Sequence, residues 1–167
     1  IKSLAKQHQA ENISIRRHLH AHPELSYQEF ETSKYVQATL TSIGIPFTVI
    51  ATTGVLGIIE GKNPKKRTIA LRADMDALPI IEENKIDYIS TKEGVMHACG
   101  HDVHTTILLG AAKILWSLKD EFEGTIKLLF QPGEEKNPGG ASYMIRDGAL
   151  KNPVPQGIIG LHVHPGL

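Results

Sequence analysis

The stretch Thr105–Phe130, TTILLGAAKILWSLKDEFEGTIKLLF, decides the fold class of this 167-residue chain. Residues 125–130 form a nearly continuous apolar run, which is typical of a buried strand in a mostly parallel sheet. Residues 105–118 place apolar side chains at helical spacing, which predicts a helix with one buried face. These apolar positions are Ile107, Leu108, Ala111, Ala112, Ile114, Leu115 and Leu118. A helix followed by a buried strand is the repeating unit of an α/β domain.

Strands and helices also alternate outside this stretch. Ser26-Tyr27-Gln28-Glu29 has the form of a capping box, so we expect a helix from there to about Ile43, with Gly44 after its end. Further helices are expected over residues 1–20 and 140–146. The expected strands are residues 47–51, 55–60, 68–73, 125–130 and 157–163. This order predicts the α/β class, with three layers and a mostly parallel or mixed sheet that carries helices on both faces.

The composition is that of one ordinary globular domain. Lys plus Arg equals Asp plus Glu at 18 each, and 41% of the residues are hydrophobic. This charge balance predicts neither nucleic acid nor a membrane as a partner, and a small-molecule substrate is expected instead. A single cysteine cannot form an internal disulfide, so we expect a reducing compartment and a cytoplasmic location.

Residues 96–104, MHACGHDVH, hold three histidines, an aspartate and the only cysteine. Imidazole, thiolate and carboxylate are the groups that bind a borderline-soft divalent metal. The same chemistry recurs in three other pairs, which each follow a predicted strand at its carboxyl end. The pairs are Asp74 and Asp76, Glu134 and Glu135, and His162 and His164. Because ligands collect at the carboxyl ends of strands in open α/β sheets, we expect all four clusters to converge on one crevice.

The spacing within each cluster suggests which side chains point together and which take different roles. Alternate residues share a face in extended backbone, so each Asp-x-Asp or His-x-His pair is able to point one way. Two adjacent glutamates point differently, so one of Glu134 and Glu135 is free to bind a metal while the other acts as a base. Taken alone, the Asp pair is equally compatible with a capped turn and the His pair with a polar strand end, and the Glu pair alone favours a solvated turn. Their joint occurrence favours a metal site.

Six motifs together resemble one family. They are residues 16–26, RRHLHAHPELS; 71–79, LRADMDALP; 96–104; 130–135, FQPGEE; 139–141, GGA; and 160–165, GLHVHP. The chain resembles the amidohydrolase branch of the aminoacylase/carboxypeptidase metallopeptidase superfamily. That branch includes hippurate hydrolase, N-acetyldiaminopimelate deacetylase and indole-acetyl-amino-acid hydrolases.

The resemblance implies roles for individual residues. Cys99 matches the cysteine that bridges the metals, and the other implied ligands are His101, Glu135 and His162. Glu134 matches the general base. Asp76 matches the aspartate that orients a residue of the site. His104 and His164 are implied to support the ligands, and Asp74 stands where other branches carry a ligating histidine. By contrast, residues 18, 20 and 22 are expected to be structural, surface or substrate-adjacent histidines.

The resemblance also implies an activity and a cofactor. It implies hydrolysis of the amide bond of N-acyl amino acids or short peptides, with two divalent ions chosen from Mn, Zn, Co or Ni. Residues 1–167 would form the first segment of the catalytic domain. The family's lid and dimerisation domain, and a return segment with one more ligating histidine, are then expected outside this chain. The full-length form is expected to be a homo-oligomer.

Two alternatives stay open at this point. One is a catalytically incomplete fragment that binds metal through Cys99, His101, Glu135 and His162 without turnover. The other is a cysteine hydrolase that uses Cys99 with His101 or His97. The dense carboxylate set argues against the second, because a thiol nucleophile does not need a pair of glutamates.

Overall fold

The structure is a computed structural model that describes residues 1–164; Pro165, the last residue of the 160–165 motif, and residues 166–167 lie outside the described part. The α/β prediction is confirmed. The helices are α1 (Lys2–Gln7), α2 (Gln9–Ala21), α3 (Phe30–Ile43), α4 (His101–Ser117) and α5 (Gly140–Arg146), with a 3-10 turn η1 (Lys119–Glu121). The strands are β1 (Phe47–Ile50), β2 (Gly54–Glu60), β3 (Thr68–Asp74), β4 (Thr125–Gln131) and β5 (Ile158–Gly160).

The sheet is mixed rather than mostly parallel. Within residues 1–164 it has five strands in the order β1-β2-β4-β3-β5. The β1–β2 and β2–β4 pairs are antiparallel, whereas β3 runs parallel to both β4 and β5. Asp74 at the end of β3 is in register with Gln131 at the end of β4. The carboxyl ends of β3, β4 and β5 therefore lie at one edge of the sheet.

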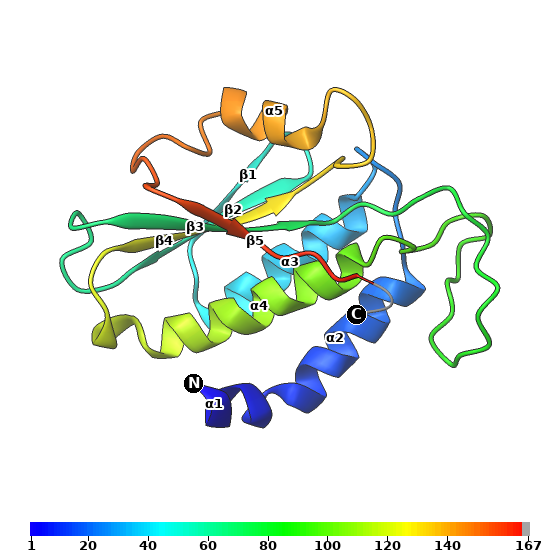
Figure 1. Cartoon of the computed structure of the whole chain (residues 1–167), viewed down its shortest axis with the longest axis horizontal. Helices are drawn as coiled ribbons and strands as arrows, with labels where there is room; N and C mark the ends of the chain where they lie inside the picture. Colours follow the sequence, from blue (N-terminus) through cyan, green and yellow to red (C-terminus); the bar gives the residue numbers. More distant parts are fainter. Residues whose placement is uncertain (165–167) are drawn as a thin grey trace.

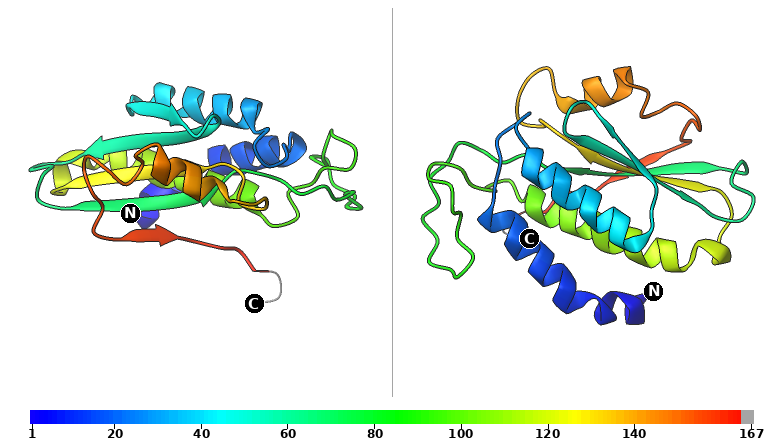
Figure 2. Two further views of the ribbon diagram at one scale, coloured as in Figure 1. Left: turned by 90° about the horizontal axis from the view of Figure 1, so that it is seen from above. Right: turned by 180° about the vertical axis from the view of Figure 1, so that it is seen from behind.

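Helices cover both faces of the sheet (Figure 1). Helices α3 and α4 lie on one face, and α2 packs on the outer side of α4. The core on this face includes Leu19 of α2, Leu40 of α3 and Phe130 of β4. The short helix α5 lies on the other face, where Met144 packs in a smaller cluster with Leu129 (Figure 2). The expected three-layer arrangement is thus present.

Strand β4 contains a buried charged residue within its apolar run. Lys127 is fully buried, and its ammonium group donates hydrogen bonds to the carbonyl oxygens of Ala149 and Lys151, at 2.8 and 2.6 Å. A buried cation is tolerated only when its donors are satisfied. Lys127 therefore ties the segment after α5 to the middle of the sheet.

The predicted capping box is wrong. Helix α3 begins at Phe30, its N-cap is Glu29, and that side chain makes no capping hydrogen bond. The carboxylate of Glu24 accepts the N–H of Thr32 instead, at 2.8 Å. The chain turns at Tyr27, whose φ is 67°, so the four residues after Leu25 cannot form a regular helical turn. Gly44 does end the helix in the left-handed conformation, as expected.

Three boundaries also differ from expectation. Helix α4 begins at His101, four residues before the expected start at Thr105. The first predicted helix is divided at His8 into α1 and α2. The last predicted strand, residues 157–163, is reduced to Ile158–Gly160, because it pairs with β3 alone over three residues. His162 therefore follows the strand rather than lying in it. In the described part of the chain, none of the helices has the length and apolar character to cross a bilayer.

Candidate metal centre

The predicted site residues meet at the edge where β3, β4 and β5 end. Strand β3 delivers Asp74 and then Asp76, and the loop after β4 carries Glu134 and Glu135. His101 is the first residue of α4, and Cys99 lies in the loop just before it. His162 follows β5. Because the three strands run parallel, residues from all four clusters come together at this edge, with the exception of His164.

His101 lies at the centre of this group. Its Nδ1 is 3.2 Å from Oδ1 of Asp76, to which the N–H donates when the ring is neutral. Its buried Nε2 has no hydrogen-bond partner within residues 1–164. Carboxylate oxygens of three acidic residues surround that nitrogen at 3.7, 3.8 and 4.0 Å, and they belong to Asp74, Glu135 and Glu134 respectively. A cation between the Nε2 lone pair of His101 and these carboxylates would be bound by both.

Cys99 and His162 form the second part of the site. The Cys99 sulfur lies 3.4 Å from Nε2 of His162, whose Nδ1 donates to the carbonyl of Val163 at 2.6 Å. That hydrogen bond leaves Nε2 available as a ligand atom. Among residues 1–164, three groups of side chains each bring their ligand atoms within 4.8 Å of one another, and His101 belongs to all three. They are Cys99, His101 and His162; His101, Glu134 and Glu135; and Asp74, His101 and His104.

Asp74 is already engaged by other side chains. Its Oδ1 is 2.6 Å from Nδ1 of His104, and its Oδ2 is 2.6 Å from a guanidinium nitrogen of Arg72. Nε2 of His104 accepts the backbone N–H of Val163 at 2.9 Å. His104 therefore supports the segment that carries His162. His164 is exposed and belongs to none of the three ligand groups.

Asp76 connects His101 to the loop of the two glutamates. Its Oδ2 accepts the Ser26 hydroxyl at 2.6 Å and the backbone N–H of Glu135 at 3.0 Å. Burial alone would raise the pKa of Asp76, but these hydrogen bonds and that of His101 outweigh burial and lower the pKa to about 2. The Asp76 carboxylate is thus ionised at neutral pH.

The electrostatics of the site favour a cation. Burial would lower the pKa of His101, yet the hydrogen bond to Asp76 and the charge of Asp74 raise it. Burial and the neighbouring Glu135 raise the pKa of the Cys99 thiol to about 11. A cysteine nucleophile needs a lowered pKa, so this environment disfavours the cysteine-hydrolase alternative. The mixed sulfur, nitrogen and oxygen donors around Nε2 of His101 fit a divalent transition metal.

A buried charge network behind His101 was not predicted. His20 of α2 contacts Oδ2 of Asp102 at 2.7 Å through Nδ1 and Oε1 of Glu82 at 2.9 Å through Nε2. The hydrogen bond to Asp102 is the main reason that the pKa of His20 is raised. His20 is therefore structural, which is one of the roles expected for residues 18, 20 and 22. The sequence signal was present, since Asp102 directly follows a proposed ligand.

His97 does not pair with Cys99. Burial lowers the pKa of His97 to about 4, and neither ring nitrogen has a hydrogen-bond partner within the described 164 residues. The acid–base partner that a cysteine hydrolase would need is therefore missing from this position.

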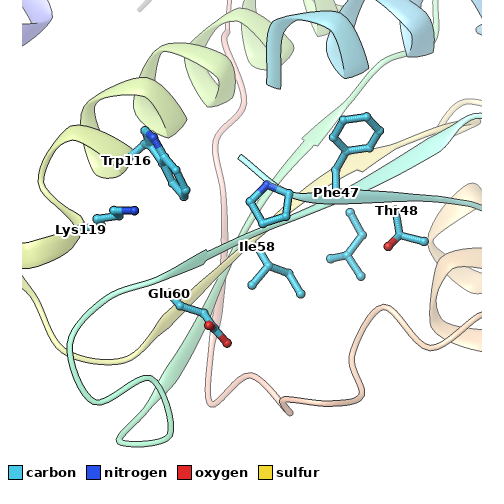
Figure 3. Close-up of a pocket in the computed structure, with 8 residues that line it drawn as sticks. Phe47, Thr48, Ile58, Glu60, Trp116 and Lys119 are labelled. Atoms are coloured by element: carbon cyan, nitrogen blue, oxygen red, sulfur yellow. The ribbon is translucent and has the colours of Figure 1, made fainter. Parts of the chain in front are cut away.

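A hollow of about 440 Å³ lies at the other end of the sheet (Figure 3). Trp116, Lys119 and Ile58 line it together with Glu60, which pairs with Thr125 at the start of β4. The ammonium of Lys119 lies 4.0 Å from the centre of the Trp116 ring. This hollow is therefore remote from the end of β4 where the metal-ligand atoms gather.

Comparison with known sequences identifies the family. The sequence pattern of peptidase family M20/M25/M40 matches residues 70–167. The chain belongs to this family. The matched region contains every residue of the candidate metal centre, from Asp74 to His162. The residues that converge in the structure therefore lie in the part of the sequence that defines the M20 family.

Relatives in the M20 family have been named as hydrolases. An N-acyl-L-amino acid amidohydrolase of Geobacillus stearothermophilus is 47% identical over 98% of this chain and 44% of its own length. An N-acetyl-L-cysteine deacetylase of Bacillus subtilis is 48% identical over 93% of this chain and 36% of its own length. The crystal structure of YXEP from Bacillus subtilis, a dinuclear metal binding peptidase from the M20 family, superposes with a TM-score of 0.90. It is 38% identical, and the match covers all of this chain and 45% of that one. The chain thus spans less than half the length of these relatives.

Proposed function

We propose that this chain carries the metal centre of a hydrolase that cleaves the amide bond of N-acyl amino acids or short peptides. The observation that carries the proposal is the buried Nε2 of His101, which has no hydrogen-bond partner among residues 1–164 and faces the carboxylates of Asp74, Glu134 and Glu135. The amidohydrolase and the deacetylase among the relatives support the substrate class.

The proposed ligands are Cys99, His101, Glu135 and His162, which hold up to two divalent ions. Mn, Zn, Co and Ni all accept this mixed donor set. A bound divalent ion supplies Lewis acidity toward the acyl carbonyl and lowers the pKa of water. Asp76 orients the His101 ring by accepting a hydrogen bond from its Nδ1–H.

Glu134 is the proposed general base. Its carboxylate lies 4.0 Å from Nε2 of His101, and its side chain is 41% exposed, so that it faces both the ligand cluster and solvent. In this role it accepts a proton from the attacking water and delivers that proton to the amine as the amide bond breaks. The adjacent Glu135 then serves as a metal ligand.

A substrate panel tests the proposal. N-acetyl and N-benzoyl amino acids are incubated with the chain after loading with Mn²⁺, Zn²⁺, Co²⁺ or Ni²⁺, and release of free amine is measured. The proposal predicts release that a chelator abolishes and added metal restores. Activity that resists the chelator would instead support the cysteine hydrolase.

Elemental analysis of the same metal-loaded samples distinguishes the remaining alternative, the catalytically incomplete fragment. Stoichiometric metal without amine release would mean that residues 1–167 bind metal as a catalytically incomplete segment of the domain. That the full-length form is a homo-oligomer, and that it works in the cytoplasm, stay predictions from the sequence.

A further inference from the structure

The segment Ser26-Tyr27-Gln28-Glu29 reaches the metal centre instead of capping a helix. The positive φ of Tyr27 turns the backbone, and the Tyr27 N–H donates to Oε1 of Glu29 at 2.9 Å. Tyr27 and Glu29 then bond directly to the loop that follows β4, and Ser26 reaches it through Asp76. Gln28 is the exception, since its side chain is exposed.

Ser26 contacts this loop through Asp76. The Ser26 hydroxyl and the N–H of Glu135 both donate to Oδ2 of Asp76, at 2.6 and 3.0 Å. The same carboxylate holds His101 through its other oxygen. One carboxylate therefore links Ser26 to a proposed ligand on each side.

Glu29 holds the start of the loop. Its carboxylate is fully buried, and Oε1 accepts the N–H of Gly133 at 2.7 Å while Oε2 accepts the Thr53 hydroxyl at 2.7 Å. Burying a carboxylate is costly unless its oxygens are hydrogen-bonded, and here both are. Gly133 directly precedes Glu134, so this bond fixes the backbone next to the proposed base.

Tyr27 holds the far part of the loop. Its hydroxyl donates to the carbonyl of Lys136 at 2.6 Å and accepts the N–H of Gly139 at 3.1 Å. Its ring also packs directly against Gly133, where a Cβ would collide with it. Gly133 has a φ of 52°, which a glycine adopts without strain. The loop is thus held on both sides of the two glutamates.

We propose that Ser26, Tyr27 and Glu29 form a clamp that positions the loop carrying Glu134 and Glu135. The side chains of these glutamates are 41% and 23% exposed, so packing constrains them little and their backbone must place them. The roles of the two glutamates rest on the proposed function. The clamp's hold on the loop rests only on the hydrogen bonds described above.

Four substitutions and one rescue test the clamp. Tyr27→Phe removes the hydroxyl and keeps the ring, and Glu29→Leu removes the carboxylate. Glu29→Gln is the rescue, because its amide oxygen still accepts the Gly133 N–H while its NH₂ donates to the Thr53 hydroxyl. Gln28→Ala in the same segment is a control. Tyr143→Phe, on the ring 5.6 Å from that of Tyr27, is the matched hydroxyl deletion.

Two measurements are made on each variant of the 167-residue chain. Amide hydrogen exchange at Gly133 and Gly139 is followed by NMR without metal, and the Kd for Co²⁺ is taken from its visible absorption. We expect Tyr27→Phe to speed exchange at Gly139, whose N–H loses its acceptor, and to raise the Kd for Co²⁺. Because Tyr27 holds the loop rather than a ligand side chain, the rise should be at most about tenfold, the lower end of the effect of losing a ligand's own partner. Glu29→Gln and both controls should match wild type in both measurements.

The outcomes separate the clamp from the proposed function. Wild-type exchange and wild-type Co²⁺ affinity in Tyr27→Phe overturn the clamp even if Glu29→Leu fails to fold. Faster exchange with unchanged affinity also overturns it, because the loop would then move without moving its ligand. If wild type binds no Co²⁺, the proposed function fails, and the exchange rates alone decide whether the clamp holds the loop.

Discussion

Nδ1 of His101 lies 3.2 Å from Oδ1 of Asp76, and this contact decides which ring nitrogen faces the other ligand atoms. With the Nδ1 proton directed to Asp76, the Nε2 lone pair points toward Glu134, Glu135 and Asp74. The second oxygen of Asp76 holds the backbone of Glu135. Asp76 thus sets the position of two proposed ligands without being a ligand itself.

Replacing Asp76 by Ala should therefore weaken metal binding without removing a ligand. The expected effect is a Kd for Zn²⁺ raised by about 10- to 100-fold, which is usual for the outer partner of a ligating histidine. A competition titration with a chromophoric chelator measures it, and the exposed Asp87→Asn is the matched control. An unchanged Kd in Asp76→Ala would contradict the orienting role.

The lowered pKa of Asp76 also predicts how stability changes with pH. Its ordinary pKa is 3.8 and its folded pKa is about 2, so the folded state favours the ionised form. This contribution is fully present above pH 3.8 and is lost as the pH falls through the folded pKa. It amounts to about 2 kcal/mol. Urea unfolding of the metal-free chain at about pH 5 and about pH 2 should show wild type losing that much more than Asp76→Asn. Equal losses in the two proteins would show that Asp76 is not specifically stabilised in its ionised form.

Glu134→Gln should separate metal binding from chemistry. The amide cannot accept a proton, so hydrolysis of an N-acetyl amino acid should fall by about 10²- to 10⁴-fold. Metal content should stay close to wild type, because Glu134 is not a proposed ligand. Glu93→Gln, at an exposed loop position, is the control. Undiminished hydrolysis in Glu134→Gln would remove it from the role of base.

Cys99 predicts a proton released on metal binding. Because the pKa of the metal-free thiol is about 11, the thiol is protonated near neutral pH and must lose that proton to bind as a thiolate. The affinity for Zn²⁺ should therefore rise with pH, and Cys99→Ala should release about one proton fewer per chain. Calorimetry in buffers of different ionisation heat counts the protons. The same count in both proteins would exclude Cys99 from the ligand set.

Much of the site was predictable because its parts follow strand ends. Asp74 and Glu134 come shortly after an expected strand, and His162 lies near the end of another. Parallel strands bring such residues to one edge. The apolar run of β4 likewise identified the buried centre of the sheet. The antiparallel β2–β4 pair was not specified by sequence, since a short apolar strand fits either direction.

The capping-box error has a different cause. Ser26 and Glu29 have the residue types and spacing of a local cap, but each makes a hydrogen bond with a residue distant in sequence, Asp76 and Gly133 respectively. Local spacing contains no information about such partners. The same limit hid the contact of His104 with Val163 and that of His20 with Asp102. What the sequence missed are therefore long-range contacts such as those of Ser26 and Glu29, which hold the segments that carry the proposed ligands.

Metal content per chain, measured by elemental analysis after dialysis, tests the central claim most directly. Wild type, Cys99→Ala and His101→Ala are compared with the exposed control Asp87→Asn. The proposed centre predicts near-stoichiometric divalent metal in wild type and the control, and a clear loss in both ligand variants. Equal metal in all four proteins, or none in wild type, would contradict the centre built around His101.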